Sequence, residues 1–472
     1  MLKSISENWP RRGLRIVGVT MAVAGFGLPF VVTFDGLSEQ GHRILSVFLM
    51  AVVLWVTEAI ALHATALLII LLEILLISDQ SVFGAIDGFE PDPYATYFAS
   101  LAHPVLMLFL GGFVLADGAA RFKLDRSLAR VLLKPFGTSP RLILLGLMLV
   151  TAGFSMFMSN TATTATLLAV ILPVVGTLPA GDRFGTGLVL SIPLAANVGG
   201  IGTPVGTPPN AIAVGSLAEA GIGVSFIGWM MLAVPPMIVL LLVSWWLLTR
   251  MYPSQADSIE LNIIGQFETS IKGRMFAVVF AATVGLWLTE PIHGIPSAIV
   301  GFMPVVVLVA AGVVSTDDLR SIQWHVLWLV AGGIALGAGV AKTGLDTWIV
   351  GQINWSSFGA TMIVALLAVL TLVLSTIISN SATANLVVPM TLSMAASSTV
   401  GLGATRAVFF VAIGASLAMA LPISTPPNAI AFSTGAVPTK DLAIVGVLVG
   451  VSGLVLYLLL APLLFTVVGV DL

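Results

Sequence analysis

The sequence of 472 residues contains no cysteine, and only 9% of its residues are charged. Without thiols there is no disulfide bond, no cysteine nucleophile and no cysteine-ligated zinc or iron–sulfur cluster. The formal net charge is -3, from 19 basic and 22 acidic residues, which leaves no basic surface for nucleic acid. The sequence also has no Walker loop, GxSxG elbow or HExxH string, so neither an enzyme nor an organic cofactor is predicted.

What the sequence does contain is long apolar runs, with 58% hydrophobic residues. A soluble domain does not have this composition. The runs are continuous, whereas a closed β-barrel needs alternating strands of about 10 residues, so we predict an all-α polytopic membrane protein. The apolar segments lie near 16–34, 43–60, 62–78, 99–119, 141–158, 162–178, 186–215, 224–249, 274–291, 296–314, 324–341, 361–378, 382–398, 406–436 and 441–469.

Basic residues in the loops predict the orientation. Arg11, Arg12 and Arg15 precede the first segment, five basic residues follow the fourth between 121 and 134, and the loop at 79–98 has only acidic charges. By the positive-inside rule we predict a cytoplasmic N-terminus. We expect the protein to be integral to the bacterial inner membrane. No small-residue cleavage pattern follows the first segment, so we expect a retained helix rather than a signal peptide.

Four pairs of similar strings recur in the same order, at offsets between 218 and 232 residues. Counted from the second segment, each half has seven apolar segments, or five if one pair forms a re-entrant hairpin. Both counts are odd, so the second half must enter the membrane from the opposite side and the repeats are inverted. The paired strings are 54–58 and 286–290, 111–125 and 332–346, 159–163 and 379–383, and 207–212 and 425–430.

The third pair of strings holds a polar triplet, Ser159-Asn160-Thr161 in the first half and Ser379-Asn380-Ser381 in the second. Each triplet joins two short apolar segments. Irregular polar backbone does not face lipid, so these turns must be buried in protein or line an aqueous cavity. A helix cap in a surface loop is the alternative for one copy, but its occurrence at both repeat positions favours two re-entrant hairpins.

The fourth pair of strings places two or three prolines inside an apolar segment, at 203–210 and 421–428. The helices must break there. A broken helix offers free carbonyl groups to a cation and free N–H groups to an anion. A short extramembrane loop is the alternative, but the pieces after Asn210 and Asn428 are too short to span a membrane alone.

Neither polar motif includes a basic side chain, although hydroxyls, amides and helix N-termini suit an acceptor-rich anion. Sodium ions held by Asn and Ser oxygens, and by the carbonyls of Gly206 and Ser424, would supply the positive charge. Proton coupling is less natural, because the motifs contain no carboxylate or histidine. His63, His103 and His293 are isolated in the sequence, so no metal cluster is predicted. We expect five ionisable residues to be interfacial or paired structural groups: Glu58, Glu73, Asp117, Glu290 and Lys342.

The doubled Ser-Asn-Thr-like triplets, each followed by Gly/Ser-Thr-Pro-Pro-Asn, together with the Trp-x-Thr-Glu strings, resemble the divalent anion/sodium symporter family of INDY-type dicarboxylate transporters. The resemblance covers about residues 43–472. It implies eleven transmembrane helices and two re-entrant hairpins, and a homodimer that works by an elevator mechanism. It divides the chain into an N-terminal segment with the first helix (1–40), a scaffold domain (41–135 and 274–357), a transport domain (136–251 and 358–472) and a cytoplasmic linker (252–273).

The resemblance also assigns site residues. One sodium ion would bind Ser155, Asn160 and Gly206, and a second would bind Ser375, Asn380 and Ser424. The substrate would contact Asn160, Thr161, Thr207 and Pro208 from one half, and Asn380, Ser381, Thr425 and Pro426 from the other. Ser381 stands where the family's dicarboxylate carriers usually have Thr, so the hydroxyl is kept and a methyl group is lost.

The leading hypothesis is therefore uptake of a C4-dicarboxylate (succinate, malate or fumarate) coupled to two or more sodium ions. A sodium-independent dicarboxylate exchanger of the same family is the alternative. A cation/proton antiporter or an arsenite-type carrier is more remote, because such carriers are expected to have an acidic residue at the broken helices and none is present here.

Overall fold

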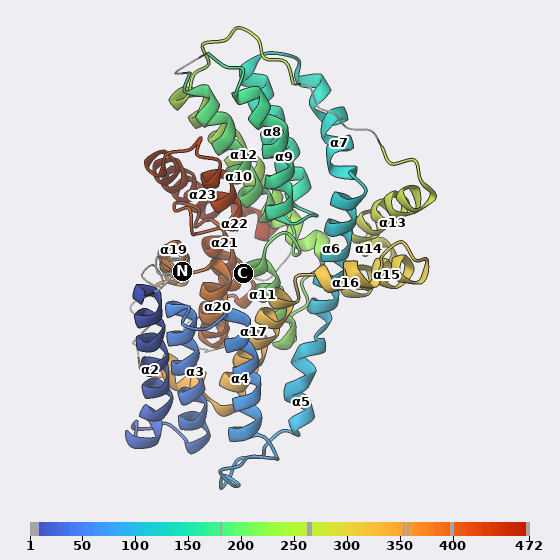
Figure 1. Cartoon of the computed structure of the whole chain (residues 1–472). Helices are drawn as coiled ribbons and strands as arrows, with labels where there is room; N and C mark the ends of the chain where they lie inside the picture. The colour runs from blue at the N-terminus through green and yellow to red at the C-terminus, as the bar shows by residue number, and fades with distance from the viewer. Residues whose placement is uncertain are drawn as a thin grey trace.

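The computed structural model describes residues 9–179, 182–261, 267–352, 355, 358–396 and 401–468. In this part of the chain every regular element is a helix, which confirms the predicted fold class (Figure 1). By length and composition, seven of the described helices can cross a membrane, and a further seven apolar helices are shorter. The seven long segments are Glu39–Thr57, Tyr94–Arg121, Phe226–Met251, Ile271–Leu288, Trp324–Thr343, Ala360–Ile377 and Thr439–Thr466.

The helices follow the apolar segments predicted from the sequence, with the two proline-containing segments each divided in two. The first half comprises α2 (Trp9–Val31), α3 (Glu39–Thr57), α4 (Leu62–Ile77), α5 (Tyr94–Ala99), η1 (Ser100–Ala102), α6 (Pro104–Arg121), α7 (Leu124–Leu133), η2 (Lys134–Phe136), α8 (Pro140–Ser155), α9 (Asn160–Val175), α10 (Phe184–Gly200), α11 (Pro208–Glu219) and α12 (Phe226–Met251).

The second half again has paired helices on either side of each repeated string. It comprises α13 (Ile271–Leu288), α14 (Glu290–His293), α15 (Ser297–Ala310), α16 (Thr316–Ser321), α17 (Trp324–Thr343), α18 (Leu345–Gly351), α19 (Ala360–Ile377), α20 (Asn380–Ala396), α21 (Ala404–Ser416), α22 (Pro426–Ser433) and α23 (Thr439–Val468).

The Trp-x-Thr-Glu strings have the same structural role in both halves. Trp55 and Trp287 are completely buried. Each indole N–H donates to a carbonyl at the start of the next apolar helix, from Trp55 to Leu62 at 3.2 Å and from Trp287 to Ser297 at 3.1 Å. The repeated string therefore fixes one helix end to the next helix start, because a buried indole N–H needs a partner.

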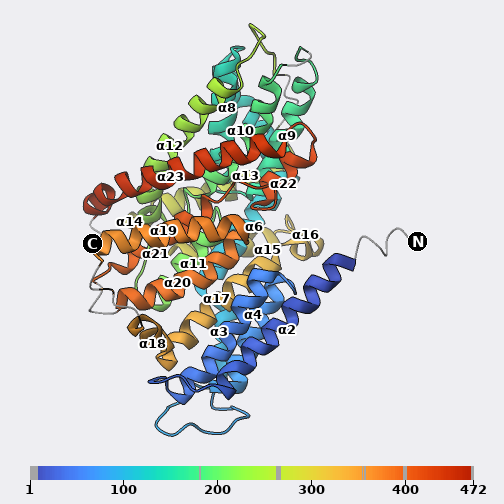
Figure 2. The ribbon, with the colours of Figure 1, turned by 90° about the vertical axis from the view of Figure 1, so that its left-hand side faces the viewer.

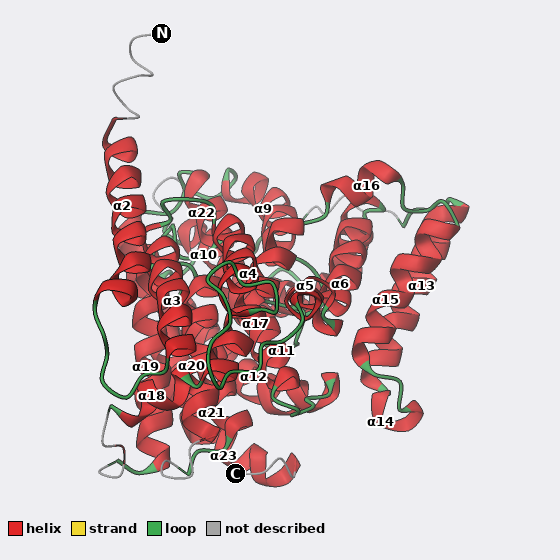
Figure 3. Ribbon diagram, turned by 90° about the horizontal axis from the view of Figure 1, so that it is seen from below, coloured by secondary structure: helices red, strands yellow, loops and turns green. Residues whose placement is uncertain are grey.

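The helices form two groups with a shared boundary (Figure 2). In one group α2, α3 and α4 pack together and α4 packs on α17, while in the other α8 packs on α10, α12 on α23 and α19 on α21. The boundary is formed mainly by α11 and α20, which both pack against α17. Seen from below, α13 and α15 stand apart at one side, and α15 packs on α6 (Figure 3).

The contact between α6 and α15 depends on two glycines. A Cβ atom at Gly111 would lie 1.7 Å from the carbonyl oxygen of Gly301, and one at Gly301 would lie 2.9 Å from the Cα of Leu108. No side chain fits between the two backbones. Small residues at such crossings allow the close packing on which membrane helices rely.

Two of the five ionisable residues expected to be interfacial or paired have partners in the structure. Glu290 accepts a hydrogen bond from Phe226 N at 2.9 Å and so caps α12, and Lys342 pairs with Asp92 at 2.9 Å. Glu58 is exposed at the end of α3. Glu73 departs from the expectation, because it is fully buried in α4 and neither carboxylate oxygen has a partner among the described residues.

An ion pair between Arg121 and Asp318 joins the end of α6 to α16. Partial burial works to raise the pKa of Asp318, but hydrogen bonds from Ser315 and the nearby Arg121 guanidinium outweigh it and hold the pKa below its usual range. The carboxylate therefore stays ionised and fixes the loop before α17, which positions one wall of the site described next.

Candidate functional site

Each polar triplet forms the turn between two antiparallel helices. Ser159 and Ser379 precede α9 and α20. Each hydroxyl accepts a hydrogen bond from the amide three residues later, from Ala162 N at 3.5 Å and from Ala382 N at 3.2 Å. A serine in this position caps a helix N-terminus. Asn160 and Asn380 are consequently the first residues of α9 and α20, with the positive ends of these helices beside them.

Behind each asparagine lies a cluster of three oxygen atoms. Ser155 Oγ contacts Asn160 Oδ1 and lies 2.7 Å from the carbonyl of Ala196. The second half repeats this arrangement, with Ser375 Oγ at 2.8 Å from both Asn380 Oδ1 and the carbonyl of Ala415. A hydroxyl has one proton and cannot donate to two acceptors at once. Such a cluster of oxygens suits a cation.

The helix breaks adjoin these clusters. A Cβ atom at Gly200 would lie 2.6 Å from Asn160 Nδ2 and 2.9 Å from the carbonyl oxygen of Gly206. The break is therefore packed directly against the turn, and Gly200 lies close to both Asn160 and the Gly206 carbonyl. In the second half, Ser424 Oγ contacts the carbonyl of Thr376 at 3.4 Å, next to Ser375 in the chain.

An asparagine satisfies the carbonyls that each break leaves free. Asn210 donates from Nδ2 toward the carbonyls of Gly200, Ile201 and Thr203 at 3.2, 3.1 and 2.8 Å. Its repeat equivalent Asn428 is also fully buried and donates in the same way within the second half. The Pro-Pro-Asn sequences thus stabilise the broken helices in a buried environment, where an unpaired backbone group is costly.

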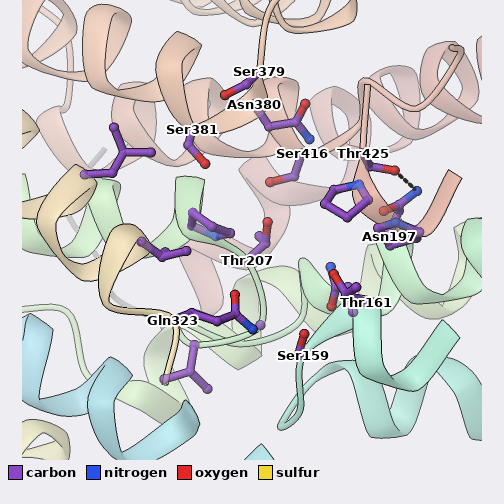
Figure 4. A pocket seen from close by; sticks show the side chains of 18 of the residues that line it. Ser159, Thr161, Asn197, Thr207, Gln323, Ser379, Asn380, Ser381, Ser416 and Thr425 are labelled. Carbon is purple, nitrogen blue, oxygen red and sulfur yellow. Dashed lines mark hydrogen bonds between the residues drawn. The ribbon is translucent and has the colours of Figure 1, made fainter. Parts of the chain in front are cut away.

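The two halves meet around one cavity of about 590 Å³ (Figure 4). Ser155 and Ser375 do not line it and lie behind the two asparagines. The structure brings all the other predicted site residues to the cavity wall: Asn160, Thr161, Gly206, Thr207, Pro208, Asn380, Ser381, Ser424, Thr425 and Pro426.

The cavity wall has no Asp, Glu, Lys or Arg among the described residues. Instead, the first residues of α9, α11, α20 and α22 lie on it. The N-termini of α9 and α20 provide N–H groups for an anion, whereas α11 and α22 begin with two prolines and contribute partial positive charge without N–H groups from these residues. The geometry therefore suits an anion held at helix ends, next to oxygen clusters that suit cations.

The sequence did not point to several residues of the cavity wall. Asn197 and Ser416 lie on α10 and α21, where the repeat has different residue types and string matching gives no signal. Gln323 and His325 come from the start of α17. The ring of His325 lies 6.0 Å from that of His63, so His63 is not isolated in the fold, although the described residues contain no group of three metal-binding side chains.

The cavity lies at one side of the boundary between the two groups of helices. Its wall includes Leu62, Gln323 and His325, which begin α4 and α17. Toward the opposite ends of these helices, His103 pairs with Glu219 at 3.1 Å and joins the start of α6 to the end of α11. In the described part of the chain, α11 and α20 pack closely on α17, whereas α22 and α9 have no comparable contact with α6. The two groups of helices are thus packed together along α11, α17 and α20 and lie apart at the cavity.

Comparisons with known proteins agree with this geometry. A family model described as the sodium:sulfate symporter transmembrane region matches residues 15–470. The sodium-dependent dicarboxylate transporter SdcS of Staphylococcus saprophyticus is 30% identical, over 93% of this chain and 89% of the relative. The protein of the same name from Staphylococcus aureus strain USA300 is 29% identical, over 92% and 88% of the two chains.

A similar fold is found in the crystal structure of the Alcanivorax borkumensis YdaH transporter, which was described as having an unusual topology. The TM-score is 0.56 with 13% sequence identity, over 87% of this chain and 99% of that chain. At this level of identity the similarity concerns the fold alone.

Proposed function

The chain belongs to the sodium:sulfate symporter family, and we propose that it takes up C4-dicarboxylates, such as succinate, malate or fumarate, by coupling their transport to sodium. It is an integral membrane transporter and not an enzyme. The observation that carries the cargo class is the uncharged cavity at the meeting point of four helix N-termini, backed by two matching oxygen clusters.

In this proposal one sodium ion binds the oxygens of Ser155, Asn160 and Gly206, and its mate binds Ser375, Asn380 and Ser424. Each asparagine has two functions, because Oδ1 faces the serine of its cluster while the same side chain reaches the cavity wall. A bound cation would leave Nδ2 free to donate to the anion. Binding of sodium and of the dianion would then support each other electrostatically.

The dianion would lie between the two triplets and the two helix breaks. Thr161, Thr207 and Pro208 would contact it from one half, and Ser381, Thr425 and Pro426 from the other, together with the two asparagines. The dicarboxylate in the printed names of the staphylococcal relatives supports this cargo. Sulfate, which the family description names, is also a dianion and belongs in any test of specificity.

The two groups of helices pack together along α11, α17 and α20 but lie apart at the cavity, and this arrangement favours an alternating-access movement of the elevator type. The transport domain would comprise 136–251 and 358–472, and the scaffold 41–135 and 274–357, with the two halves inverted. If the loop charges orient the chain as predicted, with a cytoplasmic N-terminus in the bacterial inner membrane, the cavity faces the cytoplasm. A homodimer remains part of the proposal, and the exposed apolar side chains of α13 and α15, such as Val278 and Ile299, are available to lipid or to a second copy.

Uptake by purified protein in proteoliposomes tests the proposal. Labelled succinate should accumulate when sodium is higher outside, and replacement of sodium by choline should abolish accumulation. Unlabelled fumarate, malate and sulfate are added as competitors. Uptake that ignores sodium but requires dicarboxylate inside the vesicles would identify a sodium-independent exchanger of the same family instead.

A further inference from the structure

The two halves of the chain contribute different polar side chains to the cavity wall. Near the helix break, the first half has Asn197 on α10 and the second has Ser416 on α21. The two positions are equivalent, because the residues before them, Ala196 and Ala415, supply the carbonyls of the two matching oxygen clusters. Both side chains belong to the cavity wall, and only 4% and 3% of their surfaces are exposed.

The orientation of the Asn197 amide is fixed by its neighbours. Asn428 uses its own NH2 group on the carbonyls of Met419 and Leu421, at 2.8 and 3.1 Å, so its Oδ1 can only accept. Asn197 donates from Nδ2 to that oxygen at 3.0 Å. It also donates to the Thr425 hydroxyl at 3.1 Å, as Figure 4 shows. If the amide nitrogen and oxygen of Asn197 were exchanged, its oxygen would face Asn428 Oδ1, and two acceptors cannot form a hydrogen bond.

This arrangement leaves Asn197 Oδ1 as an acceptor. No described group donates to it, and it is not among the fully covered side-chain atoms that lack a partner. It therefore reaches the cavity. The second half differs, because the shorter side chain of Ser416 does not reach Asn210, the equivalent of Asn428. Both Ser416 Oγ and Asn210 Oδ1 are buried without a partner in the described part of the chain.

At this pair of equivalent positions, the cavity thus has an amide oxygen in the first half and none in the second. Such an oxygen repels the carboxylates of a dianion but accepts a hydrogen bond from an alcohol. It lies beside Thr425, at the N-terminus of α22, where a carboxylate is favoured. A hydroxyl on the carbon next to that carboxylate would be placed to donate to Asn197.

We infer that Asn197 is a specificity-determining residue, which makes the site prefer a 2-hydroxydicarboxylate such as malate over unsubstituted succinate. The inference rests on the proposed function, since it takes a C4-dicarboxylate as the cargo. A hydrogen bond between neutral groups changes affinity by about 3- to 10-fold, so we expect malate to bind more tightly than succinate by this factor.

The test measures inhibition of sodium-driven uptake of labelled succinate by unlabelled succinate and by L-malate, and compares the two inhibition constants. In the natural protein the ratio should favour malate by about 3- to 10-fold, and in Asn197→Ser, which copies the second half, it should fall to about one. Ser191→Ala is the control, since Ser191 is fully buried on the same helix as Asn197 but its hydroxyl donates to the Leu188 carbonyl outside the cavity wall, and its ratio should not change.

A second variant covers the case in which Asn197→Ser does not fold. Ser416→Asn copies the first half, supplies a donor for Asn210 Oδ1 and adds a second acceptor to the cavity. It should improve inhibition by 2,3-dihydroxysuccinate relative to malate by about 3- to 10-fold.

Three results would overturn the inference. The first is a natural protein that does not prefer malate, and the second is a ratio unchanged by both variants. The third is an Asn197→Ser protein in which only the sodium concentration for half-maximal uptake changes, because Asn197 would then be a cation ligand. Absence of sodium-driven uptake of any dicarboxylate would instead overturn the proposed function, and this inference with it.

Discussion

Asn160 and Asn380 carry the largest share of the proposed chemistry at the scale of single residues. Each would lose a cation ligand and an anion donor on replacement by alanine, at about 1.5–3 kcal/mol for each interaction with a charged group. We therefore expect Asn160→Ala and Asn380→Ala each to reduce sodium-driven succinate uptake by at least about 100-fold.

Ser244→Ala serves as the control for these variants, since it removes a buried hydroxyl on α12 that donates to the Leu240 carbonyl, away from the cavity wall. Elution of all variants at the natural position in size-exclusion chromatography shows that the fold is kept. Uptake near the natural rate in either cavity variant would refute the site assignment.

Ser155 and Ser375 separate cation binding from anion binding, because they contact the asparagines from behind and do not line the cavity. In Ser155→Ala and Ser375→Ala the sodium concentration for half-maximal uptake should rise about tenfold, corresponding to about 1.4 kcal/mol. The affinity for succinate at saturating sodium should stay the same. Ser191→Ala, on α10 with its hydroxyl on the Leu188 carbonyl, is the control. A weaker affinity for succinate at saturating sodium would place these hydroxyls in the anion site instead.

The sequence predicted the residues of the cavity that occur in both halves, because repetition distinguished Asn160 and Asn380 from ordinary helix caps. It could not predict Asn197. An asparagine in one half and a serine in the other give no matching string, and the function inferred for Asn197 depends on hydrogen bonds to Asn428 and Thr425, far away in the chain.

At the scale of elements, the crossing of α6 and α15 is the most sensitive packing contact. Gly111→Ala places a methyl group 1.7 Å from a backbone oxygen, which a side-chain rotation cannot relieve. We expect a loss of about 1–3 kcal/mol of stability, seen as a lower unfolding temperature in detergent. Gly285→Ala on α13, where nothing lies within 4 Å of the new Cβ atom, should be neutral or slightly stabilising. Equal unfolding temperatures for the two variants would contradict the close crossing.

The helices themselves were predictable, because apolar runs and prolines determine where a membrane helix begins and breaks. The prolines at 208 and 426 begin α11 and α22, as expected for the first turn of a helix. Length alone did not identify the hairpins, since α19 has 18 residues and is long enough to cross a membrane. Their assignment depends on the polar turn that follows, which is partly exposed and lines the cavity.

At the scale of the whole molecule, transport should require α11 to leave α17. A Cβ atom at Gly215 would lie 2.9 Å from Cδ1 of Ile334, so cysteines at these two positions would be close enough to be joined. The natural chain has no cysteine, and Gly215→Cys with Ile334→Cys would be the only thiols. Cross-linking should abolish uptake, and a reductant should restore it.

The two single cysteine variants should keep their uptake under the same treatment. Full uptake by the cross-linked double variant would show that α11 and α17 do not separate during transport. Which side of the boundary is closed was not predictable from the sequence, because inverted repeats with nearly equal motifs allow both arrangements.

The described part of the cavity wall contains no Asp, Glu, Lys or Arg, and this has an electrical consequence. An unloaded carrier that brings no ionised side chain across the membrane moves no charge through the electric field, so its return step is indifferent to voltage. The loaded carrier moves the net charge of its bound ions and substrate. Each positive charge in excess of the dianion gains about 2.3 kcal/mol per 100 mV of inside-negative potential. The membrane potential would then drive accumulation through the loaded step alone.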